Sequence, residues 1–317
     1  MMVFGNKQFE RMWENYEEGN DLTYFFVISF ASFLAHELLH LISSIAFPVI
    51  LSQRWRRELP DHKKSQIVHA PNQVMNGLIA GILVKPSLTR FPSGGEFTYF
   101  NARSNNTNNT KKKILFSVFT KSFKKTSVMA TAASCGYLFY DLLLLAHFDR
   151  KNMLRAHGRT QYMIYIWHHV LPLLMWPIAL KYGTFEYFVS WGVRSELSQA
   201  AMGLRTLFIG MGLLDTILGM VVQIGFIGVY FYVRMWPLFD HVTSMIHADW
   251  FSKDVPRWQL PFAFFTIPVP AMLNVYWWFL IMSMVWKVLK GEKQGLPKNL
   301  SPALKAKRVT RSSKKMR

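Results

Sequence analysis

The chain has 317 residues, of which 51% are apolar, and 37 Lys and Arg against 18 Asp and Glu give it a formal net charge of +19. The apolar residues come in runs of about twenty, which is long enough to cross the ~30 Å hydrocarbon core of a bilayer as helices and argues against two soluble domains. The basic residues lie between and after these runs, so we expect them to meet anionic lipid headgroups or an acidic protein rather than nucleic acid.

Seven apolar runs predict an all-α, polytopic membrane protein with about seven transmembrane helices. In chain order, the predicted spans are 22–51, 66–86, 127–148, 161–180, 185–202, 206–233 and 261–288. A polar segment, 1–21, precedes them; its five acidic residues are unlike a signal or transit peptide. The single cysteine, Cys135, excludes an intrachain disulfide.

Three polar regions connect or follow the spans. The segment 87–126 contains the low-complexity tract "NARSNNTNNTKKK" and reads as a basic, Asn-rich insertion, whose end, 111–125, suits a helix lying at the membrane interface. The segments 52–65 and 149–160 and the tail 291–317 are basic. Lys and Arg in short loops set membrane orientation, so these three are predicted on one side and the N-terminus on the other. The insertion 87–126, with eight Lys and Arg, would then lie on the N-terminal side, so either the span 66–86 does not cross the membrane or the insertion follows another rule.

The stretch "HELLH" satisfies the H-E-x-x-H pattern, in which His36 and His40 share one helix face and Glu37 can activate a zinc-bound water. A catalytic zinc also needs a third protein ligand and a second shell. Asp215 is the only tempting candidate, and no recognisable motif surrounds it. We therefore expect no metal at these residues.

Ionisable residues inside the predicted spans are candidates for a functional site, because they are costly in hydrocarbon unless they face the bundle interior and find partners. Asp141 lies in "YLFYDLLLLAH", and Tyr137, one turn before it, is its predicted hydrogen-bond donor. His168 and His169, in "YIWHHVLP", point about 100° apart and can both line a wide cavity.

A second polar cluster, "SWGVRSELSQAAMGLR", places Ser198 and Arg205 on one helix face. If its glutamate, Glu196, is buried, it can pair with His168 or His169; the alternative is that Arg194 and Glu196 are solvated near the end of a span. Arg234, at the end of a span, is expected to extend toward the membrane surface. The complete set expected to line the cavity is His69, Asp141, His168, His169, Glu196, Ser198, Arg205 and Asn274.

Five motifs, in this order, resemble the TLC domain: "QIVHA", "YLFYDLLLL", "WHHVLPL", "SELSQ" followed by "LR", and "LNVYWWFLIM". The resemblance implies a six-helix bundle over about 55–290, preceded by an extra helix at 22–54. In the ceramide synthases of that family, paired histidines and two aspartates in an "HD…SD" arrangement serve acyl transfer. This chain has "SELSQ" there, so it resembles the non-synthase branch, whose members are associated with membrane lipid composition, sensing or trafficking.

Three hypotheses of function follow. The first is a protein that binds a lipid or acyl chain in its helical bundle without catalysis, with a phospholipid or acyl lipid as its only bound group. The second, favoured by the charge and the basic tail, is a structural subunit of a larger membrane complex, such as a respiratory complex of the mitochondrial inner membrane. The third is an acyl-CoA-dependent lipid acyltransferase that uses His168, His169 and Glu196. The mitochondrial inner membrane and the endoplasmic reticulum both remain open as locations.

Overall fold

The computed structural model describes residues 6–17, 22–88, 110–182, 185–247, 250–251 and 255–290. Regular secondary structure in these ranges is entirely helical, which confirms the predicted all-α class. The chain forms two compact units, Met1–Ala271 and Met272–Arg317. The insertion residues 89–109 and the basic tail 291–317 lie outside the described residues.

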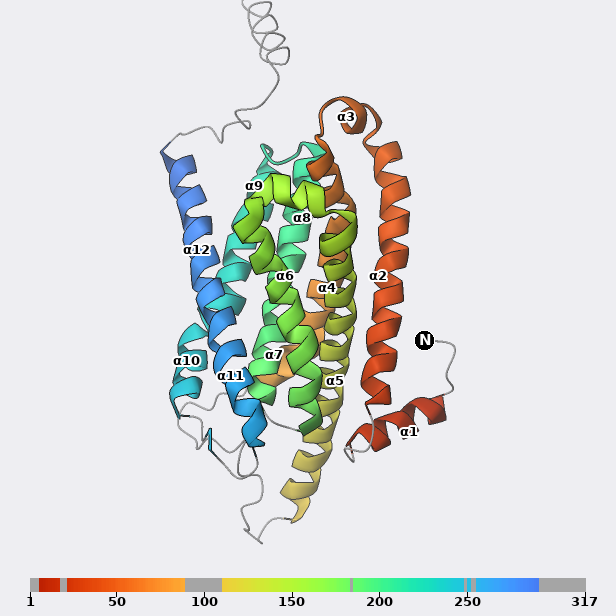
Figure 1. Cartoon of the computed structure of the whole chain (residues 1–317), viewed down its shortest axis with the longest axis vertical. Helices are drawn as coiled ribbons and strands as arrows, with labels where there is room; N and C mark the ends of the chain where they lie inside the picture. Colours follow the sequence, from red (N-terminus) through yellow and green to blue (C-terminus); the bar gives the residue numbers. More distant parts are fainter. Residues whose placement is uncertain are drawn as a thin grey trace, which may run out of the picture. The chain divides into compact units, whose positions relative to one another are not determined.

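Figure 1 shows the arrangement of the helices. They are α1 (Asn6–Glu17), α2 (Thr23–Ile50), α3 (Ser52–Arg57), α4 (Asp61–Leu88), α5 (Thr110–Leu143), the π-helical η1 (Leu144–Phe148), α6 (Arg150–Tyr182), α7 (Glu186–Ser195), α8 (Leu197–Met211), α9 (Ile217–Tyr230), the π-helical η2 (Phe231–Met235), α10 (Leu238–His247), the short 3₁₀ helix η3 (Arg257–Gln259), α11 (Leu260–Thr266) and α12 (Pro268–Leu289).

Five segments of the described chain are long and apolar enough to cross a membrane, and the protein is therefore an integral membrane protein. They are Thr23–Ile50, Asp61–Val84, Gly158–Tyr182, Ile217–Ile246 and Arg257–Lys287. Two further helical segments, α5 and the α7–α8 pair, pack among the spans of the first unit; the most extensive contacts join α4 to α8 and α2 to α5. The expected number of about seven transmembrane helices stays a prediction.

The predicted boundary between the spans 185–202 and 206–233 is wrong. Helix α8 continues through it and ends at Met211. The chain turns at Gly212, whose φ of 72° is the left-handed conformation that glycine adopts readily after a helix. Thr216 then caps α9, because its side chain accepts a hydrogen bond from the Gly219 amide.

Two other predicted segments also differ in the structure. The stretch 111–125, expected to suit a helix at the membrane interface, is continuous in α5 with the predicted span that follows it, because no Gly or Pro separates the two. The expected loop 149–160 is helical as far as Gly158, where the φ and ψ of 79° and 169° interrupt α6.

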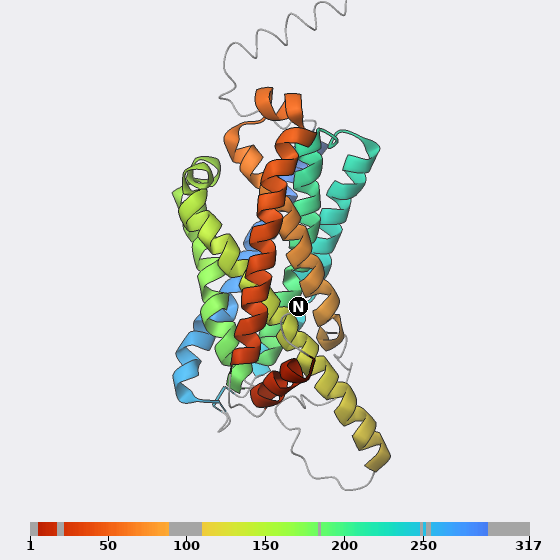
Figure 2. The ribbon, with the colours of Figure 1, turned by 90° about the vertical axis from the view of Figure 1, so that its right-hand side faces the viewer.

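The polar N-terminal segment forms an amphipathic helix against the start of α2. Trp13 and Tyr16 of α1 are buried, and the Trp13 ring lies edge-on to Tyr24, 5.1 Å away between centroids. Glu10 also accepts hydrogen bonds from Lys125 Nζ, at 2.7 and 2.8 Å. Figure 2 shows α1 lying across the end of α2 rather than continuing it, which is the orientation expected of a helix at a membrane interface.

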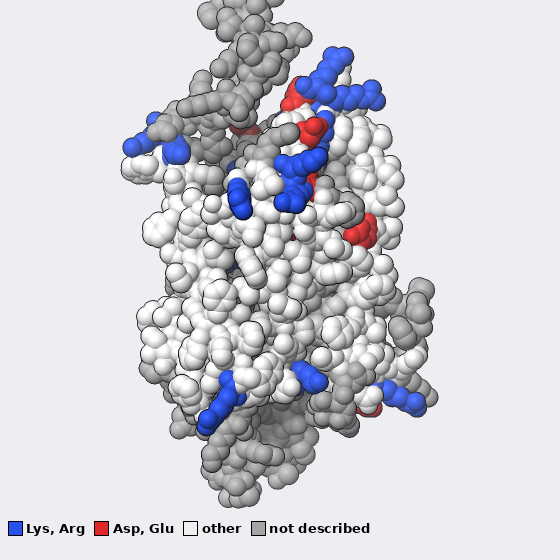
Figure 3. All heavy atoms as spheres, viewed as in Figure 1, with Lys and Arg blue, Asp and Glu red and all other residues white. Residues whose placement is uncertain are grey.

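Two basic segments lie together at the end of the first unit that is opposite to α1. The Ser65 hydroxyl donates to the Asp149 carboxylate, and Arg54 Nη2 donates to the Ile209 carbonyl at 3.3 Å. These contacts place 52–65 and 149–160 at one end, as predicted. On the face shown in Figure 3, Lys and Arg of this unit lie toward its two ends, with a broad band of uncharged side chains between them.

Orientation can be tested with single cysteines, because the native Cys135 is buried and does not react with a polar reagent. Arg56 on α3 and Lys181 at the end of α6 are exposed. Helix α3 and the end of α6 lie at opposite ends of the first unit (Figure 1). The excess of Lys and Arg predicts the Arg56 end on the cytoplasmic side. We expect a membrane-impermeant maleimide added outside intact cells to label Lys181→Cys but not Arg56→Cys. The reverse pattern would contradict this orientation.

The close approach of α5 to α2 depends on Gly136. A Cβ added there would collide with the Ser29 carbonyl oxygen and crowd Ser32, whose hydroxyl donates to the Ala133 carbonyl at 2.7 Å. We expect Gly136→Ala to lower the free energy of unfolding by about 1–3 kcal/mol, the usual cost of overpacking. The control is Gly225→Ala on α9, where the added Cβ meets no atom within 4 Å. Equal stability of the two variants in detergent melting would disprove this account.

Candidate functional site

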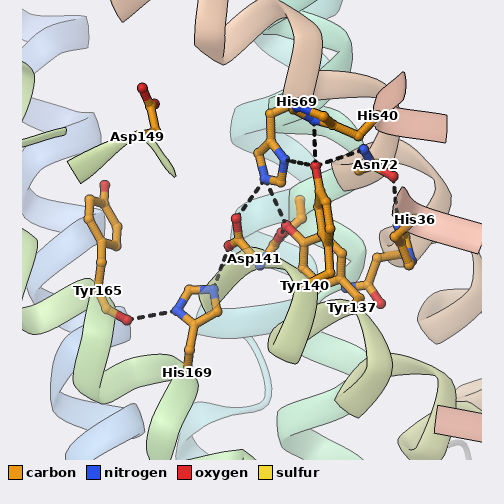
Figure 4. Close-up of polar contacts among 12 residues, drawn as sticks. His36, His40, His69, Asn72, Tyr137, Tyr140, Asp141, Asp149, Tyr165 and His169 are labelled. Atoms are coloured by element: carbon orange, nitrogen blue, oxygen red, sulfur yellow. Dashed lines mark hydrogen bonds and ion pairs between the residues drawn. The ribbon is translucent and has the colours of Figure 1, made fainter. Parts of the chain in front are cut away.

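Three side chains from α4, α5 and α6 meet at a buried carboxylate. Asp141 Oδ1 lies 2.9 Å from His69 Nε2, and Asp141 Oδ2 lies 2.6 Å from His169 Nε2 (Figure 4). The exposed fractions of His69, Asp141 and His169 are only 8%, 6% and 4%. A carboxylate at this depth is tolerated because both of its oxygens are paired. We call these three residues the Asp141 centre.

Both nitrogens of His169 are engaged. Nδ1 donates to the Tyr165 carbonyl at 2.7 Å, while Nε2 faces the Asp141 carboxyl. Either Nε2 carries a proton and the ring is an imidazolium, or Asp141 carries that proton and donates it to Nε2. In both cases the ring has no free lone pair, so His169 cannot accept a further proton without breaking one of these bonds.

The hydroxyl of Tyr140 joins α2 and α4 to the Asp141 centre. It lies 2.8 Å from His40 Nδ1, 3.2 Å from His69 Nδ1 and 3.1 Å from Asn72 Nδ2. Asn72 Oδ1 in turn lies 2.8 Å from His36 Nδ1. The two histidines of "HELLH" therefore contact a phenol and an amide from neighbouring helices, and each uses a ring nitrogen to do so.

No metal site is formed by the "HELLH" residues or elsewhere in the described ranges, where no three His, Cys, Asp or Glu side chains are grouped as ligands. His36 is buried, whereas Glu37 and His40 are half-buried. The i, i+4 spacing serves contacts between helices here: the rings of His36 and His40 lie 5.7 and 5.8 Å from the Tyr140 ring, between centroids.

A second group of buried polar residues, the Glu196 cluster, lies between α4, α8 and η2. Glu196 Oε2 accepts hydrogen bonds from Gln199 Nε2 at 2.6 Å and from Asn76 Nδ2 at 3.4 Å. Glu196 Oε1 lies 3.8 Å from Arg234 Nη2, and Arg234 Nε donates to Ser198 Oγ at 2.7 Å. The cation that lies nearest to Glu196 is thus Arg234 rather than His168 or His169.

The expectation that Arg234 extends toward the membrane surface is also wrong. Its exposed fraction is 4%. Helix α9, η2 and α10 lie within one candidate span, Ile217–Ile246, so Arg234 is interior to the span rather than at its end. An arginine in that position requires a buried acceptor, and Glu196 and Ser198 provide it.

Tyr137 connects the two groups. Its hydroxyl donates to Gln199 Oε1 at 2.8 Å and lies 3.4 Å from His69 Nε2. The predicted hydrogen bond from Tyr137 to Asp141 is wrong, since the partners of Asp141 are the two imidazoles. Side chains on a helix lean toward its N-terminus. Tyr137 therefore extends away from Asp141, which lies one turn later on the same helix.

Irregular backbone occurs next to these polar residues. Glu196 separates α7 from α8, Arg234 lies in the π-helical η2, and the π-helical η1 begins at Leu144, three residues after Asp141. Short π-helical segments are frequent at functional sites, and broken helices at membrane depth are tolerated where they are buried in protein or line a cavity. The positions of these irregularities mark the same region as the charged side chains.

Three residues predicted to line the cavity belong neither to the Asp141 centre nor to the Glu196 cluster. His168 is half-buried, with its ring perpendicular to that of His169 at 5.4 Å between centroids. Arg205 is half-buried and near Lys63 of α4. Asn274 belongs to α12 in the second unit. The role of the predicted residues in lining a lipid cavity stays a prediction.

Sequence reasoning missed Asn72, Asn76 and Tyr140. A signal for the two amides was present, because His69, Asn72 and Asn76 are spaced by three and four residues and so share one face of α4. Tyr140 follows Tyr137 by three residues and shares the inner face of α5 in the same way. A stripe of polar residues within a membrane span indicates a polar helix interface.

The stability of the bundle is expected to depend on Asp141. Asp141→Asn leaves two buried imidazoles without their carboxylate, and breaking a buried pair in this way typically costs about 3–5 kcal/mol. The control, Asp61→Asn, makes the same chemical change at an exposed residue that contacts only Lys64 among the described residues, at 3.2 Å, and should change stability by less than about 0.5 kcal/mol. Equal melting temperatures for the two variants would exclude a structural role for the Asp141 centre.

Comparison with known proteins agrees with the motifs. The chain is 29% identical to TLC domain-containing protein 4-B of Danio rerio over 169 residues, which are 52% of this chain and 60% of the relative. It is 28% identical over 174 residues to TLC domain-containing protein 4 of Xenopus tropicalis and to protein 4-A of Xenopus laevis, in each case over 54% of this chain and 64% of the relative. The chain thus matches less than two thirds of the length of each relative.

No solved structure matches the chain with statistical significance. The family model for the TLC domain matches residues 97–283, which is more than half of the 317 residues. The relatives are TLC domain-containing proteins rather than ceramide synthases, as the "SELSQ" motif predicted. The chain belongs to the TLC domain family of integral membrane proteins.

Proposed function

We propose that this protein binds a lipid or acyl chain within its helical bundle and acts on it without covalent chemistry. The observation that carries this proposal is the pair of buried charged groups in a membrane-spanning bundle, the Asp141 centre and the Glu196 cluster. Two such groups are costly at this depth, and a bundle that only had to be stable is better served by apolar packing. Polar groups retained there are suited to the polar part of a lipid.

Charge balance supports a lipid with a neutral or zwitterionic polar part. Asp141 is offset by its imidazoles, and Glu196 by the Arg234 guanidinium. Arg234 and Glu196 are separated by 3.8 Å, which is longer than a direct hydrogen bond. A hydroxyl, amide or amine of a lipid is small enough to exchange hydrogen bonds with this pair, while its acyl chain extends toward the apolar surfaces of the spans.

The geometry of His169 argues against this residue as the general base of the acyltransferase hypothesis, which leaves His168 as its candidate. A general base must have a lone pair within reach of the proton that it removes. Both ring nitrogens of His169 are already engaged, with the Tyr165 carbonyl and with Asp141. The hypothesis of a subunit in a larger complex depends on the basic tail, which lies outside the described residues.

Anionic phospholipid is the proposed partner of the basic end of the first unit. Exposed cations of α3 and the start of α6 lie there, among them Arg56, Arg57, Arg150 and Lys151. Each Lys or Arg near an anionic leaflet contributes about 1 kcal/mol of attraction. This contact is with the membrane surface and is separate from the lipid proposed for the bundle interior.

Lipid retention tests the proposal. The full chain is purified in detergent, its lipids are counted by native mass spectrometry, and their masses are then determined after extraction. We expect the wild type to retain a lipid and Glu196→Gln to retain about tenfold less, since a lost charge-assisted hydrogen bond corresponds to roughly 1.4 kcal/mol or more. The matched control is Asp149→Asn, another buried carboxylate, which contacts Ser65 and Asn152 instead.

Melting curves of the same samples separate loss of lipid from loss of fold. A wild type without lipid, or equal retention in Glu196→Gln and the control, would refute binding at the Glu196 cluster. Supplying labelled acyl-CoA addresses the catalytic alternative: an acylated lipid of new mass would refute the absence of covalent chemistry.

A further inference from the structure

The "HELLH" stretch on α2 is a motif for which lipid binding gives no role. It forms no metal site in the described chain, yet His40 is hydrogen-bonded to Tyr140, and Tyr140 to the Asp141 centre. We propose that His40, Tyr140, His69 and Asp141 form a proton-transfer path that connects the surface of α2 with the buried Asp141–His169 pair.

The path is continuous in the structure. His40 Nδ1 lies 2.8 Å from Tyr140 Oη, Tyr140 Oη lies 3.2 Å from His69 Nδ1, and His69 Nε2 lies 2.9 Å from Asp141 Oδ1. Every atom along it is a ring nitrogen, a hydroxyl oxygen or a carboxyl oxygen that can both receive and release a proton. His40 is half-buried and the other members are buried, so His40 is the outer end of the path.

Hydrogen-bond counting shows why Tyr140 can pass a proton on. Its oxygen accepts a bond from the Asn72 amide, and Asn72 is oriented for this because its Oδ1 accepts from His36 Nδ1. One hydroxyl proton and one lone pair then remain for two neighbours, His40 and His69. Tyr140 either donates to His69 and accepts from His40, or donates to His40 and accepts from His69. Both arrangements satisfy the Tyr140 hydroxyl and the three nitrogen atoms that face it.

Moving between the two arrangements transfers one proton. In the first, His40 carries protons on both nitrogens and His69 carries one on Nε2. The Nδ1 proton of His40 moves to Tyr140 Oη as the phenol proton moves to His69 Nδ1. Tyr140 is a phenol again, His40 is neutral and His69 is an imidazolium. His69 then releases its Nε2 proton to Asp141 Oδ1, so that the net result is one proton moved from His40 to Asp141, with no other reactant.

Other titratable and charged groups face the path from each neighbouring element. They are His36 and Glu37 of α2, Asp149 before α6, His168 and His169 of α6, Glu196 between α7 and α8, and Arg234 of η2. None of them lies between two members of the path, but they set the charge that a transferred proton experiences. Chains of Asp, Glu and His in membrane spans serve as proton relays in other proteins.

The consequence is that the charge of the Asp141–His169 pair can change without water entering the bundle. A proton arriving at Asp141 neutralises the carboxylate and leaves His169 without an anionic partner. Helix α2, which like α4 precedes the residues 97–283 matched by the TLC family model, would thereby influence the charge of Asp141 within that region. This role is independent of which lipid the bundle binds.

Hydrogen–deuterium exchange of the buried histidine rings tests the path. The full chain, labelled with ¹⁵N-histidine and reconstituted in phosphatidylcholine bilayers, is transferred to D₂O and followed by solid-state NMR. We expect Tyr140→Phe to slow exchange of the His69 ring protons about tenfold or more, which corresponds to about 1.4 kcal/mol in an activation barrier. His40→Gln keeps the phenol but removes the outer end of the path, and should slow exchange to a similar extent.

Tyr137→Phe is the matched comparison. It removes an identical hydroxyl three residues away, which also approaches His69 but does not lie between His40 and His69. We expect His69 to exchange at the wild-type rate in this variant. Unchanged exchange in both Tyr140→Phe and His40→Gln, or equal slowing by Tyr137→Phe and Tyr140→Phe, would overturn the proposal. The measurement requires no lipid ligand, so its failure is distinct from failure of lipid binding.

Discussion

The carboxylate of Asp141, placed between two imidazoles, is the interaction on which the arrangement of the first unit depends. An unpaired carboxylate in the membrane interior is very unfavourable, so α5 can be inserted here only if α4 and α6 bring His69 and His169 to it. Each helix is thereby fixed in rotation about its own axis. A turn of α6 by one residue would replace His169 by His168, which points about 100° away.

Helix α2 is attached to this arrangement by polar and apolar contacts together. Gly136 allows α5 to approach it closely, and His36 and His40 extend across to Asn72 and Tyr140. The outward face of α2 is strongly apolar, with side chains such as Phe30, Leu38 and Ile45 more than half exposed, which is the character expected of a lipid-facing surface. The helix therefore divides its two faces between lipid and polar partners.

The sequence predicted the long, uninterrupted helices well and the interrupted ones poorly. Helix α2 agrees with the predicted span 22–51 within about one residue, because a continuous apolar run is bounded by polar segments at both ends. The α7–α8 break at Glu196 and the turn at Gly212 were missed, since hydropathy averaged over many residues does not register a single break. Asp141 and Glu196 are both buried in the structure, which is what the cost of exposing a charge to lipid leads one to expect.

The partners of those charges could not be predicted, and the reason is geometric. Spacing along one helix suggested Tyr137 for Asp141, yet the observed partners, His69 and His169, come from two other helices. The same is true of Glu196, whose cation, Arg234, is 38 residues later in the chain. Contacts between helices depend on the rotation of each helix about its axis and on its shift along that axis, which spacing along one helix does not determine.

The i, i+4 histidines of "HELLH" illustrate this limit most clearly, because identical spacing serves a metal ion in one setting and a tyrosine of a neighbouring helix in this one. What decides between them is whether a third ligand or a phenol faces the pair, and that depends on the packing of α5 against α2.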